Sequence, residues 1–146
     1  MTLKPNDPCW CANGLKYKRC HGNRHALDHF ERVPLGTVAP PRSVPEHIER
    51  PDYVTTGTIS TSRAPQIHDA GSLERMRHAC AVAAEVLLRT GEHVAVGRTT
   101  DELDEFAHDV YVELGAYPST LHYRGFTKSI CTSVNGVICH GIPDDR

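Results

Sequence analysis

The sequence has few aromatic residues, no long apolar run and no leader-like N-terminus. Aromatic side chains make up 6% of its 146 residues, with one tryptophan. No apolar stretch reaches the roughly 18–20 residues that a membrane-spanning helix needs, and residues 1–5 do not lead into the apolar segment of a secretory signal. These absences predict a cytoplasmic protein without a membrane partner. Because 39% of the residues are hydrophobic, the chain can still bury a core, which excludes wholesale disorder.

Composition and charge divide the chain into three expected regions. Residues 1–32 are rich in Cys and His and hold six basic against three acidic residues, whereas residues 33–146 hold ten basic and fifteen acidic residues. Opposite net charges predict modules with different partners. Residues 33–66 carry six prolines, which restrict the backbone and predict an extended linker or arm. Residues 67–146 show the apolar periodicity of folded protein.

Two helices and one hairpin are expected in residues 67–146. The first helix has Ser72 as its N-cap and Gly91 just past its end, and the second has a capping box at Thr99 and Glu102 and stops at Gly115. The apolar stripes expected to face the core are Leu73, Met76, Cys80, Ala83 and Leu87, then Leu103, Phe106, Ala107, Val110 and Leu114. Residues 129–134 and 137–142 flank Asn135-Gly136, a typical hairpin turn. Such a hairpin needs further strands, so these residues are expected to be part of a larger α+β domain.

Three of the six cysteines crowd into residues 9–20. Cys9, Cys11 and Cys20, with His21 directly after, supply three thiolates and one imidazole. Without a secretory signal this crowding favours a metal over disulfides, and the donor set is typical of a closed, structural zinc site. His25 lies four residues beyond His21 and is an alternative fourth ligand. Residues 1–32 have too few apolar side chains to fold alone, so metal binding and folding are expected to be coupled.

The segment DPCWCANGLKYKRCHG, residues 7–22, resembles the SEC-C zinc motif. Its departures from the usual motif, such as Trp10 for proline, leave the four ligand positions intact. The basic residues near the ligands are Lys16, Lys18, Arg19 and Arg24. Such a surface can dock phosphate backbone, and the resemblance implies contact of residues 1–32 with the ribosome or a protein. A solvated basic face without a partner is the alternative.

Short motifs follow one another from the arm to the end of the chain. They are VPEHIERPDY (44–53), VGRTTDEL (96–103), GAYPS (115–119), GFTKS (125–129), TSVN (132–135) and CHGIPD (139–144). Together they resemble type I methionine aminopeptidases. The resemblance implies that residues 67–146 are the N-terminal half of a pita-bread (creatinase/aminopeptidase-like) catalytic domain, preceded by the zinc motif and the Pro-rich arm.

The resemblance also implies an activity and its residues. Type I methionine aminopeptidases remove the initiator methionine from nascent proteins by hydrolysis at two divalent metal ions (Co, Mn, Fe or Zn). By motif position His140 matches a histidine that hydrogen-bonds the scissile amide, which makes it the implied catalytic and substrate-binding residue. Tyr123, Phe126 and Cys131 match positions lining the pocket for the methionine side chain, and Asn135 matches a loop that holds a monovalent cation. From position alone, a structural role for His140 is the alternative.

The five metal ligands of that family lie beyond its Cys-His-Gly-Ile-Pro motif, and none of those positions occurs in these 146 residues. We therefore expect the chain to correspond to the N-terminal part of such an enzyme and to lack activity by itself. The alternative is a non-catalytic adaptor that binds the ribosome or another protein through its zinc motif.

Overall fold

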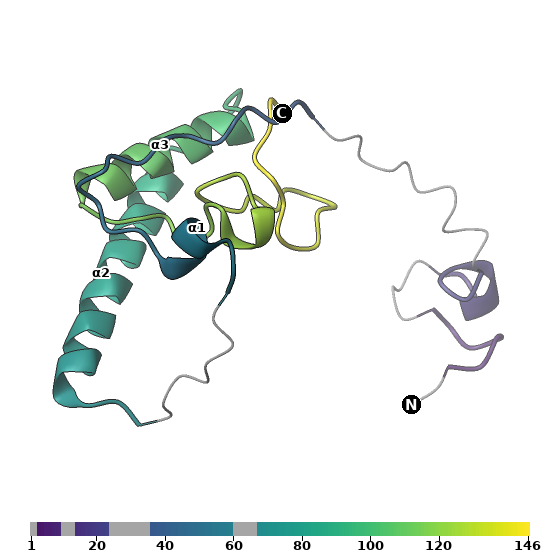
Figure 1. Cartoon of the computed structure of the whole chain (residues 1–146). Helices are drawn as coiled ribbons and strands as arrows, with labels where there is room; N and C mark the ends of the chain where they lie inside the picture. The colour runs from purple at the N-terminus through teal and green to yellow at the C-terminus, as the bar shows by residue number, and fades with distance from the viewer. Residues whose placement is uncertain (1–2, 10–13, 24–35, 60–66) are drawn as a thin grey trace. The chain divides into compact units, whose positions relative to one another are not determined.

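A computed structural model describes residues 3–9, 14–23, 36–59 and 67–146 (Figure 1). The chain divides into two compact units, Met1–Pro34 and Leu35–Arg146. The elements, in chain order, are η1 (Tyr17–Arg19), α1 (Asp52–Thr56), α2 (Ala70–Glu92), α3 (Thr100–Glu113) and η3 (Tyr123–Gly125). Across these described ranges, no helix is both long and apolar enough to cross a membrane.

The first unit is a short loop that folds back on itself. Pro8 and Lys16 form an antiparallel bridge, and Cys9 N donates a hydrogen bond to Leu15 O at 2.9 Å. Gly14 allows the reversal, because its φ of 78° lies in the left-handed region that side chains disfavour. The chain then enters η1, which leads directly to Cys20.

Helix α3 begins and ends where the sequence predicts. Thr99 Oγ1 accepts a hydrogen bond from Glu102 N at 3.1 Å, and Glu102 Oε2 accepts one from Thr99 N at 2.7 Å. This reciprocal pair is the predicted capping box, which satisfies two amides that the helix start leaves free. The helix runs to Glu113, and Gly115 leaves it with a φ of 69°.

Helix α2 is longer than the sequence pattern predicts. Its N-cap is Asp69, whose carboxylate accepts a hydrogen bond from Ser72 N at 2.7 Å, so the prediction of Ser72 as N-cap is wrong. Gly91 lies inside the helix because α2 continues one residue beyond it. Helix α2 ends at Glu92, and His93 directly after it stacks on Phe106 of α3 with ring centroids 4.0 Å apart. This stacking holds the last turn of α2 against α3.

The faces that the two helices bury differ from the prediction for α2. Val86 is 2% exposed and packs with Ala107 and Val110 of α3, so the predicted α3 stripe is confirmed. The predicted α2 stripe faces solvent, with Leu73 38% and Leu87 74% exposed. That part of the core prediction is wrong, because α2 buries the face it turns towards α3, and sequence periodicity does not reveal which face has a neighbour.

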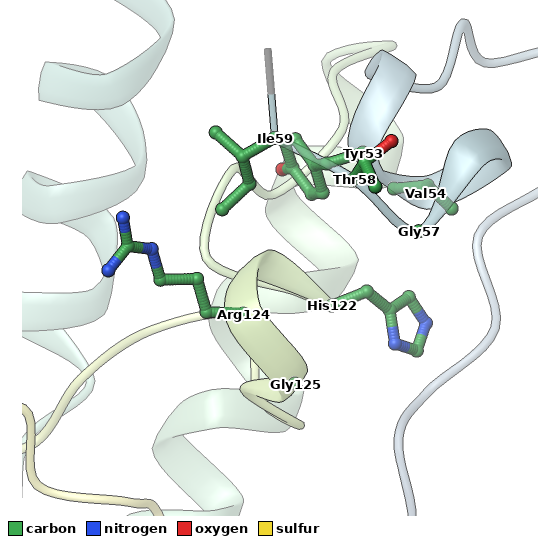
Figure 2. A pocket seen from close by; sticks show the side chains of 8 residues that line it. All are labelled: Tyr53, Val54, Gly57, Thr58, Ile59, His122, Arg124 and Gly125. Atoms are coloured by element: carbon green, nitrogen blue, oxygen red, sulfur yellow. The ribbon is translucent and has the colours of Figure 1, made fainter. Parts of the chain in front are cut away.

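The described part of the proline-rich arm is extended but packed. Val44 and Ile48 are 7% and 3% exposed and cluster with Leu121, and in Figure 1 the arm runs along α3 before it enters α1. The hydroxyl of Tyr53 in α1 donates to Ser119 O at 2.7 Å. Helix α1 and η3 together line a pocket (Figure 2).

Residues 129–142 do not form the predicted hairpin and contain no strand. The turn itself is present, with Asn135 at a φ of 52°. Two backbone hydrogen bonds span it: Val137 N donates to Val134 O at 3.2 Å and closes the turn, and Thr132 N donates to Gly141 O at 2.9 Å. A Cβ at Gly141 would lie 1.9 Å from the Thr132 oxygen, so glycine permits this contact. The hairpin prediction is wrong because two strands without a third neighbour are marginal in water, and Ile138 is 96% exposed.

Candidate functional site

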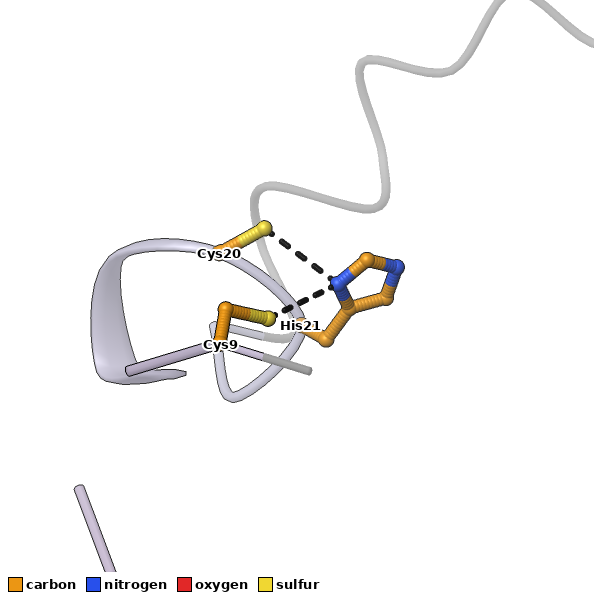
Figure 3. Close-up of side chains that lie close together, drawn as sticks. All are labelled: Cys9, Cys20 and His21. Carbon is orange, nitrogen blue, oxygen red and sulfur yellow. Dashed lines mark hydrogen bonds between the residues drawn. The ribbon is translucent and has the colours of Figure 1, made fainter. Parts of the chain in front are cut away.

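Cys9, Cys20 and His21 gather in the first unit (Figure 3). His21 Nδ1 lies 3.1 Å from Cys9 Sγ and 3.2 Å from Cys20 Sγ, and the three ligand atoms all lie within 4.8 Å of one another. Cys20 N donates to Tyr17 O at 3.0 Å, so the η1 turn delivers the two adjacent ligands together. Cys9 is 5% exposed, which shields one sulfur from water.

This donor set fits a metal site. A sulfur and a nitrogen on one tetrahedral zinc ion are expected about 3.5 Å apart, and the two observed separations are slightly shorter. Cys11 and the alternative ligand His25 lie outside the described residues, so the complete ligand set stays a prediction. In the ranges that the structure describes, this is the one group of three or more His, Cys, Asp or Glu residues with such spacing.

The second unit brings together two of the four predicted substrate-contacting residues. Cys131 Sγ lies 3.9 Å from His140 Nδ1, and both residues are exposed. Although Cys131 is exposed overall, partial desolvation of its thiol raises the pKa of that thiol, with the nearby Cys139 thiol and the Asp104 carboxylate adding to the effect. At neutral pH this favours the uncharged thiol, which suits an apolar contact better than a nucleophile.

Tyr123 and Phe126 lie on the η3 turn. Phe126 N donates to Tyr123 O at 3.0 Å, and the Tyr123 ring meets Tyr53 of α1 edge to face with centroids 5.4 Å apart. Tyr123 is 41% exposed and Phe126 half-buried. None of the four predicted residues lines the pocket of Figure 2. The described residues therefore form two pairs and no single enclosed substrate pocket.

A buried charged network holds the segment before Cys131, and the sequence analysis missed it. Asp104 of α3 is 1% exposed. Its Oδ1 accepts hydrogen bonds from Ser129 N at 2.7 Å and from Ile130 N at 3.0 Å. Its Oδ2 forms an ion pair with Arg42 Nη1 at 2.7 Å. Burial raises the pKa of the Asp104 carboxyl, although these amides and the Arg42 charge oppose the rise. Arg42 thus links the arm to α3, and Asp104 links α3 to residues 129–130.

Lys128 and His108 extend this network. Lys128 is 1% exposed, and its ammonium pairs with the Asp101 carboxylate. Burial alone would raise the pKa of Asp101, but hydrogen bonds from Arg42 and Lys128 outweigh it and hold that pKa below its ordinary value. His108 Nδ1 lies 2.8 Å from Ser129 Oγ. The sequence does contain a pattern that could have predicted this network. Residues 101, 104 and 108 share one face of the helix, beside its apolar stripe.

Asp144 anchors the segment that follows His140. Its carboxylate is almost fully buried and accepts from Gly36 N at 3.1 Å and from Arg146 Nη2 at 2.5 Å, while its own amide donates to Thr100 Oγ1 at 2.8 Å. The Asp144 carbonyl accepts from the backbone amide of Asp101 at 2.9 Å, in the first turn of α3. One residue therefore ties residues 140–146 to both the arm and α3.

Acid is expected to weaken this anchor between about pH 4 and pH 2. Hydrogen bonds from the Arg146 side chain, helped by the amides of Arg146 and Gly36, lower the pKa of Asp144 to about 2 from 3.8. Because the folded-state pKa is the lower one, the stabilisation is complete above pH 4 and is lost as the pH falls through 2. Urea unfolding of the native chain and of Asp144→Asn measures this, and the difference between them should shrink across that range. A difference independent of pH would contradict the assignment.

Comparison with known proteins gives the class of protein first. Residues 74–146, half of the chain, match the profile of metallopeptidase family M24, and the chain belongs to that family. Residues 6–23 match the SEC-C motif, which covers the Cys9, Cys20 and His21 cluster. Membership of a metallopeptidase family implies divalent metal ions. The described residues hold no second cluster beside Cys9, Cys20 and His21 that could bind them.

The relatives within that class are methionine aminopeptidases. Methionine aminopeptidase 2 of Mycobacterium tuberculosis is 50% identical over 109 residues, which cover 75% of this chain and 38% of the relative. Methionine aminopeptidase 1C, chloroplastic/mitochondrial, of Arabidopsis thaliana is 44% identical over 138 residues, covering 92% and 40%. The crystal structure of methionine aminopeptidase from Rickettsia prowazekii matches with a TM-score of 0.54 at 43% identity, over 56% of this chain and 33% of that one.

These matches identify the fold and the extent of the similarity. The second unit has part of the pita-bread fold of a methionine aminopeptidase, as the sequence predicts. The chain spans about two fifths of the length of the two curated relatives and a third of the Rickettsia protein.

Proposed function

We propose that this chain forms part of an enzyme that removes the initiator methionine from nascent proteins by metal-dependent hydrolysis in the cytoplasm. The observation that carries the proposal is the 44–50% identity to methionine aminopeptidases over three quarters or more of the chain. Several of these relatives have mitochondrial or chloroplastic forms, so an organelle is the alternative compartment.

In this proposal the second unit contributes substrate contacts. His140 hydrogen-bonds the scissile amide, and Tyr123, Phe126 and Cys131 contact the methionine side chain, for which a thiol and two aromatic rings are suitable neighbours. The separation of 3.9 Å between Cys131 and His140 supports this. Asp104 holds Ser129 and Ile130 before Cys131, and Asp144 fixes the segment after His140 to α3. The first unit binds zinc through Cys9, Cys11, Cys20 and His21 as a structural ion.

The catalytic cations have no place among the described residues, so no step of the reaction is assigned to them here. No carboxylate–histidine cluster of the kind that holds two divalent ions occurs there. We therefore propose that the 146-residue chain alone does not hydrolyse peptides. Incubation with Met-Ala-Ser and Co²⁺ or Mn²⁺ should give no free methionine, and clear turnover would contradict this proposal.

A chimera tests the residue roles directly. Fusion of residues 1–146 to the remaining part of the Mycobacterium tuberculosis relative should release methionine from Met-Ala-Ser. His140→Ala should lower kcat by about 10²–10⁴-fold, the usual contribution of a positioned proton-transfer or hydrogen-bonding group. The exposed His78 on α2 provides the matched control, and His78→Ala should leave the rate unchanged. Full activity of the folded His140→Ala chimera would overturn the assignment.

A second role is favoured for the first unit by its exposed basic residues. Lys16, Lys18 and Arg19 are all exposed next to the metal cluster. We propose that this surface docks the ribosome or a protein partner, either to bring the peptidase to nascent chains or, in the adaptor alternative, without catalysis. An inactive chimera together with metal-dependent cosedimentation of the chain with ribosomes would favour the adaptor.

A further inference from the structure

A pocket of about 600 Å³ lies between the arm and the η3 turn (Figure 2). Its arm side includes Tyr53, Val54 and Ile59, and its other side is made by His122, Arg124 and Gly125. The volume falls in the range of small-ligand pockets. The residues predicted from sequence to contact substrate are not among its lining, but the pocket adjoins them, because its Tyr53 ring meets the Tyr123 ring edge to face.

The described lining of the pocket carries a positive charge, from Arg124, and no acidic side chain. Arg124 is exposed, and its guanidinium lies 5.7 Å from the centroid of the Tyr123 ring. Among the described residues that line the pocket there is no Asp or Glu, although acidic residues outnumber basic ones in residues 33–146. Within the described residues, no carboxylate lies within ion-pair distance of Arg124, in contrast to Arg42 and Arg89.

The backbone directs the two basic side chains apart. His122 and Arg124 have φ values of 64° and 50°, in the left-handed region that residues other than glycine rarely adopt. In Figure 2 the His122 side chain, just before η3, and the Arg124 side chain, within it, point in opposite directions. Strained backbone of this kind is found most often where function requires a particular side-chain placement.

The arm side is largely apolar, although Thr58 also lines it. Tyr53 is held by its hydrogen bond of 2.7 Å to Ser119 O and by its edge-to-face contact with Tyr123. Val54 and Ile59 supply aliphatic surface beside it. A ligand that is complementary both to this apolar side and to Arg124 therefore combines an apolar body with negative charge.

We propose that this pocket binds an acidic peptide segment, with Arg124 pairing with a carboxylate and Tyr53 and Ile59 contacting the peptide chain. In the enzyme this segment is the part of the nascent protein that follows the initiator methionine. That identification rests on the proposed function, whereas recognition of an acidic peptide does not. Arg124 is then a specificity-determining residue that favours substrates with Asp or Glu downstream of the cleaved bond.

Binding to the full 146-residue chain, loaded with Zn²⁺, tests the proposal without hydrolysis. The probes are the N-acetylated peptides Ala-Asp-Glu-Asp and Ala-Asn-Gln-Asn, which have the same shape but differ in charge and cannot be substrates of an aminopeptidase. Titration is followed by calorimetry and by the amide NMR signals of Gly57 and Gly125. The acidic peptide should bind about tenfold more tightly, as expected for a charge-assisted contact, and it should shift both glycine signals.

Arg124→Gln should remove the preference for the acidic peptide, and Arg124→Lys should retain part of it. Arg77→Gln, at an exposed arginine on α2, is the matched control and should leave binding unchanged. Equal binding of the two peptides, or an undiminished preference in Arg124→Gln, would overturn the proposal. Because neither probe is cleaved, these results are independent of whether the chimera releases methionine.

Discussion

Chelation of the bound metal is expected to unfold residues 3–23 and to leave the helical circular-dichroism signal of α2 and α3 unchanged. In the first unit, Cys9 is the one hydrophobic residue of the described part that is buried, so an apolar core cannot hold the loop. Structural zinc sites in small motifs contribute on the order of 10–16 kcal/mol of apparent binding free energy, which is folding free energy when the apo segment is unfolded. Amide hydrogen exchange at Cys9 and Tyr17, which donate to Leu15 O and Asp7 O, should accelerate to the rate of an unfolded chain.

Matched variants separate metal loss from general damage. Cys20→Ser should abolish stoichiometric binding of Zn²⁺ and reproduce the effect of the chelator. Cys80→Ser removes an exposed thiol of α2 outside the cluster and should bind the metal normally. His21→Ala compared with His25→Ala identifies the fourth ligand. Retention of slow exchange at Cys9 after complete metal removal would show that the loop folds without the ion.

Replacement of Asp104 is expected to cost about 3–5 kcal/mol of unfolding free energy, the usual result of breaking a buried ion pair from one side. Asp104→Ala leaves the amides of Ser129 and Ile130 without their acceptor. It also removes one ion-pair partner of Arg42, whose side chain is largely buried. Urea unfolding followed by circular dichroism measures the loss. Asp104→Asn should be milder, because its amide oxygen can still accept from both backbone donors.

The adjacent Glu105 is the control for this experiment. It lies 3.7 Å from the same guanidinium, but its side chain is 62% exposed. Solvent screens such a pair, so Glu105→Gln should change the unfolding free energy by less than about 1 kcal/mol. Similar losses in Asp104→Ala and Glu105→Gln would contradict the role given to the buried network.

Several features that depend only on neighbouring residues were predicted correctly from the sequence, although the N-cap of α2 was not. The capping box of α3 requires only Thr99 and Glu102, and its end requires only the positive φ of Gly115. The clustering of Cys9, Cys20 and His21 likewise depends on a short loop and its turn at Gly14. The candidate substrate residues were assigned by motif position, and their roles await the chimera.

Features that depend on distant segments were not predicted. Lys128 and Asp104 look like solvent-exposed charges in the sequence, yet both are 1% exposed. Asp101 of α3 supplies the counter-charge for Lys128, and Arg42 of the arm supplies it for Asp104. The solvent-facing stripe of α2 and the pocket beside Arg124 also depend on which segments pack together. The sequence alone thus determined the family, the metal-binding motif and the ends of α3, since these rest on local spacing. Tertiary structure decided which faces and charges are buried, because burial depends on partners that local spacing does not specify.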